Sequence, residues 1–160
     1  MKKIKLLVIF ALFSSLQLNA QQTVVSDAFK ISFVAPELLE EYDTEDDSII
    51  GFENDNYAVD IEVYPRTEEI DNIYTDLKYG ARKLAEFMDF ENIVDGGKIP
   101  NITKAYYVKT EEDDGGTLIP VYILLIINDT LDVAYEVSIY CYGNDAISGE
   151  QLVKSFKLLD

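Results

Sequence analysis

The chain has no histidine and only one cysteine among its 160 residues. The missing histidine excludes the commonest general base, the commonest zinc ligand and every Ser-His or Cys-His catalytic pair. A single cysteine cannot form an internal disulfide, and the alternating segment "YEVSIYCYG" around Cys141 predicts a thiol packed inside a strand. No Ser-x-x-Lys pair and no glycine-rich turn from strand to helix is present. The sequence therefore predicts a protein that is not an enzyme and carries no cofactor.

Basic residues are scarce as well, with 13 Lys and Arg against 30 Asp and Glu. The formal net charge of −17 repels nucleic acid and anionic lipid, so we expect no nucleic acid partner. Loss of the leader described next would remove three basic residues and no acidic one, which moves the net charge to −20.

Long apolar runs are absent, and the longest lies at the start of the chain. In "MKKIKLLVIFALFSSLQLNAQQ", three lysines precede the apolar residues 6–13, and a small residue, Ala20, comes before Gln21. This arrangement predicts a secretory signal peptide over residues 1–20, cleaved near Ala20. The apolar run is far shorter than the ~20 residues that a membrane span needs. We expect a periplasmic or secreted protein without a membrane span, whose residues 21–160 form a single domain.

The periodicity of the remaining chain predicts seven strands and two helices. Alternating apolar residues predict strands at 28–36, 47–53, 57–65, 92–100, 102–111, 117–128 and 131–143. Spacings of three and four predict a helix over 69–88 and another over 145–160, while "ELLEEY" at 37–42 would form one helical turn at most. The order βββαββββα indicates an α+β fold with a mostly antiparallel sheet of about six or seven strands packed against helices.

Four segments carry more specific predictions. In "TLIPVYILLIIN", both alternating sets of residues are apolar, which predicts an internal strand covered on both faces. In "YAVDIEVYP", Asp60 and Glu62 alternate with apolar residues, so one face of that strand should be exposed to solvent. "EEDDGG" predicts a tight hairpin, and Gly96 with Gly97 predicts a bulge.

Taken in order, "FKISFVAPE", "YAVDIEVYP", the long helix, the "EEDDGG" hairpin and the ending "EQLVKSFKLL" resemble the PsbP-like family. Many members of that family are exported bacterial proteins of unknown function. The resemblance covers nearly all of residues 21–160 and implies an accessory or binding role. It supplies no catalytic residue.

The acidic stretch "DTEDDSIIGFEN" is the one candidate metal site. Asp43, Glu45 and Asp47 match the first three ligand positions of a calcium-binding loop, and they are the weak metal candidates. Ser48 stands where that loop needs glycine, Asn54 stands where it needs a bidentate glutamate, and strands follow in place of a helix. An acidic solvated turn is the favoured interpretation, and no metal ligand is assigned.

Tyrosines on the strands of the second half are the candidate partner surface, because exposed aromatic clusters are frequent in interfaces. The residues concerned are Tyr106, Tyr122, Tyr140 and Tyr142. Tyrosine is also a favoured strand residue, and half-buried packing within the sheet is the preferred interpretation of these side chains. We therefore expect an exported, non-catalytic binding or accessory domain with a protein partner. The alternatives are a calcium-dependent module using the acidic loop and a small carboxylate-based hydrolase.

Overall fold

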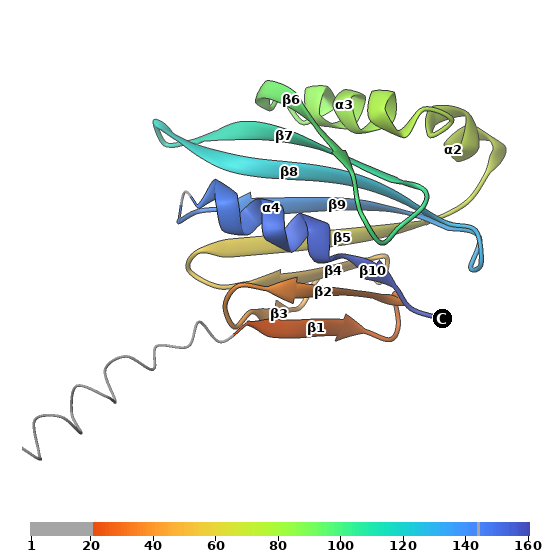
Figure 1. Cartoon of the computed structure of the whole chain (residues 1–160), viewed down its shortest axis with the longest axis horizontal. Coiled ribbons are helices and arrows are strands. Elements are labelled where there is room, and N and C mark those ends of the chain that lie inside the picture. Colours follow the sequence, from red (N-terminus) through yellow and green to blue (C-terminus); the bar gives the residue numbers. More distant parts are fainter. Residues whose placement is uncertain (1–20, 144) are drawn as a thin grey trace, which may run out of the picture.

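The fold is α+β and is built on a seven-stranded antiparallel sheet, as the sequence predicts. The computed structural model describes residues 21–143 and 145–160, so the predicted leader lies outside the described residues. The strands of the large sheet follow the order β3-β4-β5-β9-β8-β7-β6, from bottom to top in Figure 1. Their bounds are β3 Glu40–Tyr42, β4 Ile49–Glu53, β5 Tyr57–Pro65, β6 Glu91–Lys98, β7 Ala105–Asp114, β8 Thr117–Asn128 and β9 Val133–Cys141.

One face of the large sheet is covered by two elements together. Helix α4 (Ala146–Ser155) lies on this face, in front of the sheet in Figure 1, and contacts β8 and β9. Beside it lies a three-stranded sheet of order β1-β2-β10, formed by Gln22–Ser26, Ile31–Ala35 and Lys157–Leu158. The two elements are tied together where the backbone N–H of Val34 donates to Ser155 Oγ over 2.8 Å. Phe33 of β2 stacks on Phe156 at the end of α4, with ring centroids 4.9 Å apart, and closes the larger of two hydrophobic cores.

The opposite face is covered only in part. Helices α2 (Glu68–Ile73) and α3 (Leu77–Phe87) follow β5, and α3 packs on β6, β7 and β8. Ala81 and Ala85 are buried on the side of α3 that faces the sheet, and they form a second hydrophobic core with side chains of β8. Within the described residues, neither helix packs extensively on β4, β5 or β9 on this side, although Tyr74 at the end of α2 donates to Glu136 of β9.

Strand β8 confirms the prediction of an internal strand with two apolar faces. Tyr122, Leu124 and Ile126 belong to the core beneath α4. Val121, Ile123, Leu125 and Ile127 belong to the core beneath α3. The strand lies between β7 and β9, so its backbone is hydrogen-bonded on both edges as well.

The predicted hairpin and bulge are also confirmed. Strands β7 and β8 are joined at Asp114 and Thr117 by a two-residue turn, in which Gly115 and Gly116 both have positive φ angles. Glycine adopts positive φ angles more easily than any other residue, because it has no Cβ atom. The register of β6 against β7 shifts between Asp95 and Gly97, at the predicted bulge.

The structure differs from the local predictions in three respects. The helix expected over 69–88 is two helices, because Asp76 has an extended backbone and its carboxylate caps α3 by accepting from Tyr79 N. The segment expected as a helical turn forms strand β3, because it finds a pairing partner in β4. Strands β1 and β10 were not expected, since they are short and pair only with β2.

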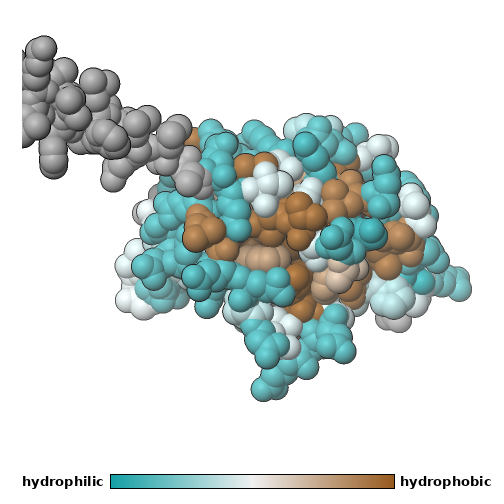
Figure 2. Space-filling view, turned by 90° about the horizontal axis from the view of Figure 1, so that it is seen from below, coloured by the Kyte–Doolittle hydropathy of each residue, from teal (hydrophilic) through white to brown (hydrophobic). Residues whose placement is uncertain are grey.

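No helix in the described part of the chain is long and apolar enough to cross a membrane. Figure 2 shows the molecule from below, the side on which β1 to β4 lie in Figure 1. Hydrophobic side chains gather there in a shallow hollow bordered by hydrophilic ones.

Candidate functional site

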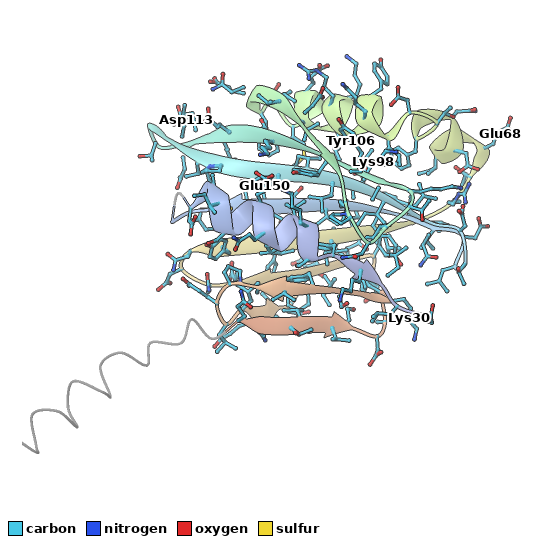
Figure 3. All side chains as sticks on the ribbon, viewed as in Figure 1. Lys30, Glu68, Lys98, Tyr106, Asp113 and Glu150 are labelled. Carbon is cyan, nitrogen blue, oxygen red and sulfur yellow. The ribbon has the colours of Figure 1, made fainter. Side chains whose placement is uncertain are left out.

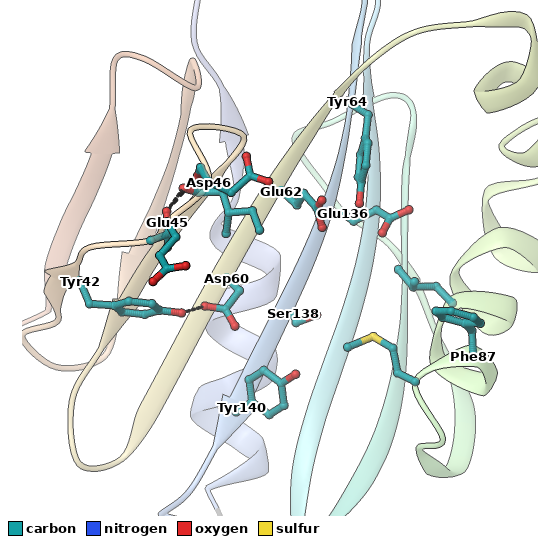
Figure 4. Close-up of a pocket in the computed structure, with 14 residues that line it drawn as sticks. Tyr42, Glu45, Asp46, Asp60, Glu62, Tyr64, Phe87, Glu136, Ser138 and Tyr140 are labelled. Carbon is teal, nitrogen blue, oxygen red and sulfur yellow. Dashed lines mark hydrogen bonds between the residues drawn. The ribbon is translucent and has the colours of Figure 1, made fainter.

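The uncovered half of the α3 side forms an open groove of about 620 Å³ (Figure 4). Its floor is the face of β5 and β9, one wall is the end of α3, and the other wall is β3 with the loop that follows it. The lining residues are Tyr42, Thr44, Glu45, Asp46, Ile49, Asp60, Glu62, Tyr64, Leu84, Phe87, Met88, Glu136, Ser138 and Tyr140. Five of these described lining residues are acidic and none is basic, so the groove is strongly negative.

The acidic floor results directly from the pairing of β5 with β9. Glu62 is the direct partner of Glu136 in the antiparallel register, and Asp60 is the partner of Ser138. Side chains of directly paired residues lie on the same face, with Cβ atoms about 5 Å apart. Two carboxylates in this position repel each other and destabilise the fold. The stability of the fold therefore does not explain why the pair is present.

Two of the floor carboxylates are held in place by tyrosine hydroxyls. Tyr42 donates to Asp60, and Tyr74 donates to Glu136. Burial raises the pKa of Asp60 above its ordinary value, although the Tyr42 hydroxyl counteracts this. Burial also raises the pKa of Glu136, with a further contribution from the charge of Glu62. The groove therefore holds carboxyl groups that ionise less readily than free ones do.

Gly51 is the reason that Tyr42 can reach Asp60. Tyr42 pairs with Gly51 across β3 and β4, and Gly51 pairs with Asp60 across β4 and β5. The tyrosine ring lies over the glycine: a Cβ atom at position 51 would stand 2.0 Å from Tyr42 Cζ. Only glycine leaves room for the ring, so the left wall in Figure 4 depends on this residue.

The opposite wall is apolar and reaches into solvent. Phe87, at the end of α3, is 87% exposed, and the adjacent Met88 is 36% exposed. Figure 4 shows Phe87 across the groove from Tyr42, with the floor carboxylates between them. An exposed phenylalanine beside a groove is an energetic liability in the free protein, since burying such a ring is favourable by about 2 kcal/mol.

The acidic loop forms a tight turn, and its acidic side chains lie on different sides of it. Glu45 lines the groove, whereas Asp43 and Asp47 line a second hollow beside Phe29. Asp46 accepts from Ser48 N over 2.8 Å and from Ser48 Oγ over 2.7 Å, and these hydrogen bonds lower the pKa of its carboxyl. Among the described residues, no cluster of three or more acidic or cysteine side chains could hold a metal ion. The structure thus does not bring the candidates Asp43, Glu45 and Asp47 together as ligands.

The candidate tyrosines are divided between the two faces of the sheet. Tyr140 lines the groove, and its ring stacks on that of Tyr142, with centroids 6.3 Å apart. Tyr106 is on the same side but packs with the core beneath α3, as Figure 3 indicates. Tyr122 lies on the opposite face, where it is buried and donates to the carbonyl of Ala146 over 2.5 Å. Only Tyr140 and Tyr142 of the four share a surface at the groove.

Cys141 is buried, as its place in an alternating strand predicts. Burial raises the pKa of the thiol to about 12, so it is not a thiolate at neutral pH. The sulfur belongs to the core beneath α4, where Gly149 comes close to it. The thiol therefore has a packing role.

Most residues of the groove were not singled out by the sequence. The alternation of β5 predicted a wet face bearing Asp60 and Glu62, but not what would lie beside it. Glu136 and Ser138 alternate in the same way within β9, and this is the signal that could have found them. Nothing in the local sequence indicates that Phe87 would remain exposed, because an apolar residue in a predicted helix is expected to pack against the rest of the protein.

Comparisons with known proteins show the fold alone. No family model matches the chain, and no curated protein matches it. The solved structure of the Ran-binding protein Mog1p from Saccharomyces cerevisiae is similar, with a TM-score of 0.56 and 12% identity over 88% of this chain and 96% of that one. A mutant of Mog1 gives a TM-score of 0.54, also at 12% identity, over the same shares of the two chains.

A Bacteroides thetaiotaomicron protein is similar too, with a TM-score of 0.54 and 17% identity over 87% of this chain. The match covers 48% of that protein, so this chain spans about half its length. The fold of this chain is thus the one found in Mog1p.

The groove is suited to binding. Its floor offers negative charge, one wall offers an apolar surface, and the tyrosines offer rings with hydroxyls. Asp60 and Glu136 are already engaged by Tyr42 and Tyr74. Such a surface can hold a ligand that combines positive charge with apolar groups.

Proposed function

We propose that this chain is an exported, non-catalytic binding domain, related to the PsbP-like proteins, which contacts a protein partner through the groove on the α3 side. The observation that carries the proposal is the uncovered sheet face beside an exposed phenylalanine, Phe87. A groove that leaves both charge and an aromatic ring exposed is typical of a surface that is covered in a complex. Support also comes from the fold, since the similar protein Mog1p is a Ran-binding protein.

A capture experiment with two matched variants tests this function. The full chain is expressed with its leader, and the exported product is immobilised and exposed to extracts of the producing cells. We expect one protein to be retained by the wild type and lost with Phe87→Asp. Ile147→Asp is the matched control, because Ile147 is 75% exposed but lies on α4, which covers the other face. Equal retention by all three proteins, or by none, would refute the proposed site.

Export is a proposal that rests on the N-terminal pattern alone. The mass of the purified product tests it directly, since cleavage near Ala20 leaves a chain that begins at Gln21. A product of full length, recovered from the cytoplasm, would contradict it.

A carboxylate-based hydrolase is the second candidate, and one observation favours it. Glu136 has a raised pKa and is paired with Glu62 in a concave site, which is how a general acid and its partner are often arranged. Both residues nevertheless project from adjacent strands of one floor, whereas glycoside hydrolysis needs two carboxylates that flank the bond to be broken. Hydrolysis of a chromogenic glycoside or ester by the wild type, abolished in Glu136→Gln, would establish this activity in place of simple binding.

A further inference from the structure

We propose that the groove takes a basic segment of the partner, in which a cationic side chain lies over the Glu62–Glu136 pair and a neighbouring apolar side chain packs on Phe87. This inference rests on the proposed function and adds the chemistry of the partner to it. It follows from the charge of the floor, the composition of the wall and the closed backbone of the strands.

The floor is a ready site for one positive charge. Glu62 and Glu136 are directly paired, so a cation placed above them removes their mutual repulsion and gains attraction to both. Asp60 is two residues from Glu62 on the same face of β5, which extends the negative surface along the strand. Tyr64 and Tyr140 line the same space, and tyrosine rings attract cations through their faces.

The wall supplies the second point of contact. Phe87 stands across the groove from the acidic loop (Figure 4), and Met88 and Leu84 of the same helix end also line the groove. An aliphatic side chain laid on these residues would cover the most exposed phenylalanine of the described chain. A ligand with charge alone would leave this ring in water.

The groove must recognise the side chains of the partner, because the strands of the floor have no backbone N–H or C=O groups free to form hydrogen bonds with it. Strand β5 is hydrogen-bonded to β4 and β9, and β9 is hydrogen-bonded to β5 and β8. Neither strand has an open edge to which an added strand could bind. Charge and shape therefore determine what the groove accepts.

A second copy of this chain is a poor source of the cation. Ten basic residues remain after residue 20, and seven of them already form ion pairs with acidic side chains of the same molecule. Two copies would also bring together two strongly negative surfaces. Anionic lipid is disfavoured for the same reason, so a basic protein segment is the occupant that the charges select.

The test uses a fluorescein-labelled peptide with alternating arginine and leucine, Gly-Gly-Arg-Leu-Arg-Leu-Gly-Gly, and fluorescence anisotropy. Two matched peptides replace both leucines with serine or both arginines with glutamate. We expect the first peptide to bind, the serine peptide to bind about fivefold more weakly, and the glutamate peptide not to bind. Affinity should fall further between about 50 and 150 mM salt, since the charges are partly exposed.

Variants place the binding in the groove. Glu62→Gln with Glu136→Gln should weaken the arginine–leucine peptide about tenfold. Glu150→Gln with Asp160→Asn removes the same number of negative charges away from the groove, with Glu150 on α4 (Figure 3), and should leave the affinity unchanged. Equal losses in the two double variants would mean that only net charge is sensed, which overturns the proposal. No binding of the arginine–leucine peptide up to about 1 mM, the weak end of specific binding, would overturn it as well.

Competition with spermidine tests whether the groove prefers a peptide segment to a small cation. If spermidine displaces the peptide at equal charge concentration, the apolar contact contributes nothing and the proposal fails. The proposed binding function and this account of the partner's chemistry can be tested separately. A captured partner that is lost with Phe87→Asp but retained by Glu62→Gln with Glu136→Gln would support the binding site while refuting this account of its partner.

Discussion

The two halves of the α3 side of the sheet have opposite characters. Beneath α3, strand β8 presents Val121, Ile123 and Leu125, all fully buried. Two strands away on the same side, β5 presents Asp60 and Glu62 to an open groove. The difference lies in what covers each half.

One helix is too narrow to cover this face. An α-helix with its side chains is about 10 Å wide, and neighbouring strands lie about 4.8 Å apart, so one helix covers about three strands. Helix α3 covers β6, β7 and β8, and neither α2 nor α3 packs extensively on β4, β5 or β9 among the described residues. The opposite face has α4 and a three-stranded sheet together, which cover it more fully. Polar residues therefore occur where the covering layer ends.

The largest expected effect comes from the covered half. Ile123→Ala leaves a cavity beneath α3 and should lower the free energy of unfolding by about 2–5 kcal/mol. Ser138→Ala, on the same side but in the groove, should change it by less than about 0.5 kcal/mol. Urea denaturation of both variants measures the contrast. Similar losses at the two positions would mean that the groove half is as tightly packed as the covered half.

A smaller effect is expected at Gly51, within the open half. Gly51→Ala places a Cβ atom where the Tyr42 ring lies, so the ring must move and its hydrogen bond to Asp60 is lost. We expect a loss of about 1–2 kcal/mol. In a Tyr42→Ala background the same change at position 51 should cost little, because the clash no longer exists. A double-mutant cycle with a coupling energy near zero would contradict this account of the wall.

The smallest effect concerns pH and has opposite signs on the two faces. Glu136 has a raised pKa in the folded protein, so its contribution to stability falls as pH rises from about 4.3, the unfolded value, through the raised one. Glu150 on α4 accepts from Lys109, Lys154 and Tyr107, which lowers its pKa to about 2. The contribution of Glu150 is present above about 4.3 and is lost as pH falls towards about 2.

Thermal melts of two variants test these signs. At pH 7, Glu136→Gln should be slightly more stable than the wild type and Glu150→Gln slightly less stable, each by under about 1 kcal/mol. Below pH 4 the gain in Glu136→Gln should disappear, and near pH 2 the loss in Glu150→Gln should disappear. A loss of stability at pH 7 in Glu136→Gln would show that its hydrogen bond from Tyr74 outweighs the cost of burying the charge.

Local sequence was enough to predict which side of each strand faces apolar surroundings, because side chains alternate along a strand with a period of two. It predicted the two-faced strand at 117–128, the wet face with Asp60 and Glu62, the hairpin at Gly115 and the strongly negative charge. These properties depend on neighbours in the chain.

Which strands lie side by side depends instead on how the whole chain packs. Glu62 and Glu136 are far apart in the sequence and meet because β5 pairs with β9. Tyr42 reaches Asp60 only across a glycine, and Phe87 faces the groove only because α3 ends there. Strand pairing and helix placement follow from the packing of the complete core, and no local periodicity reports them.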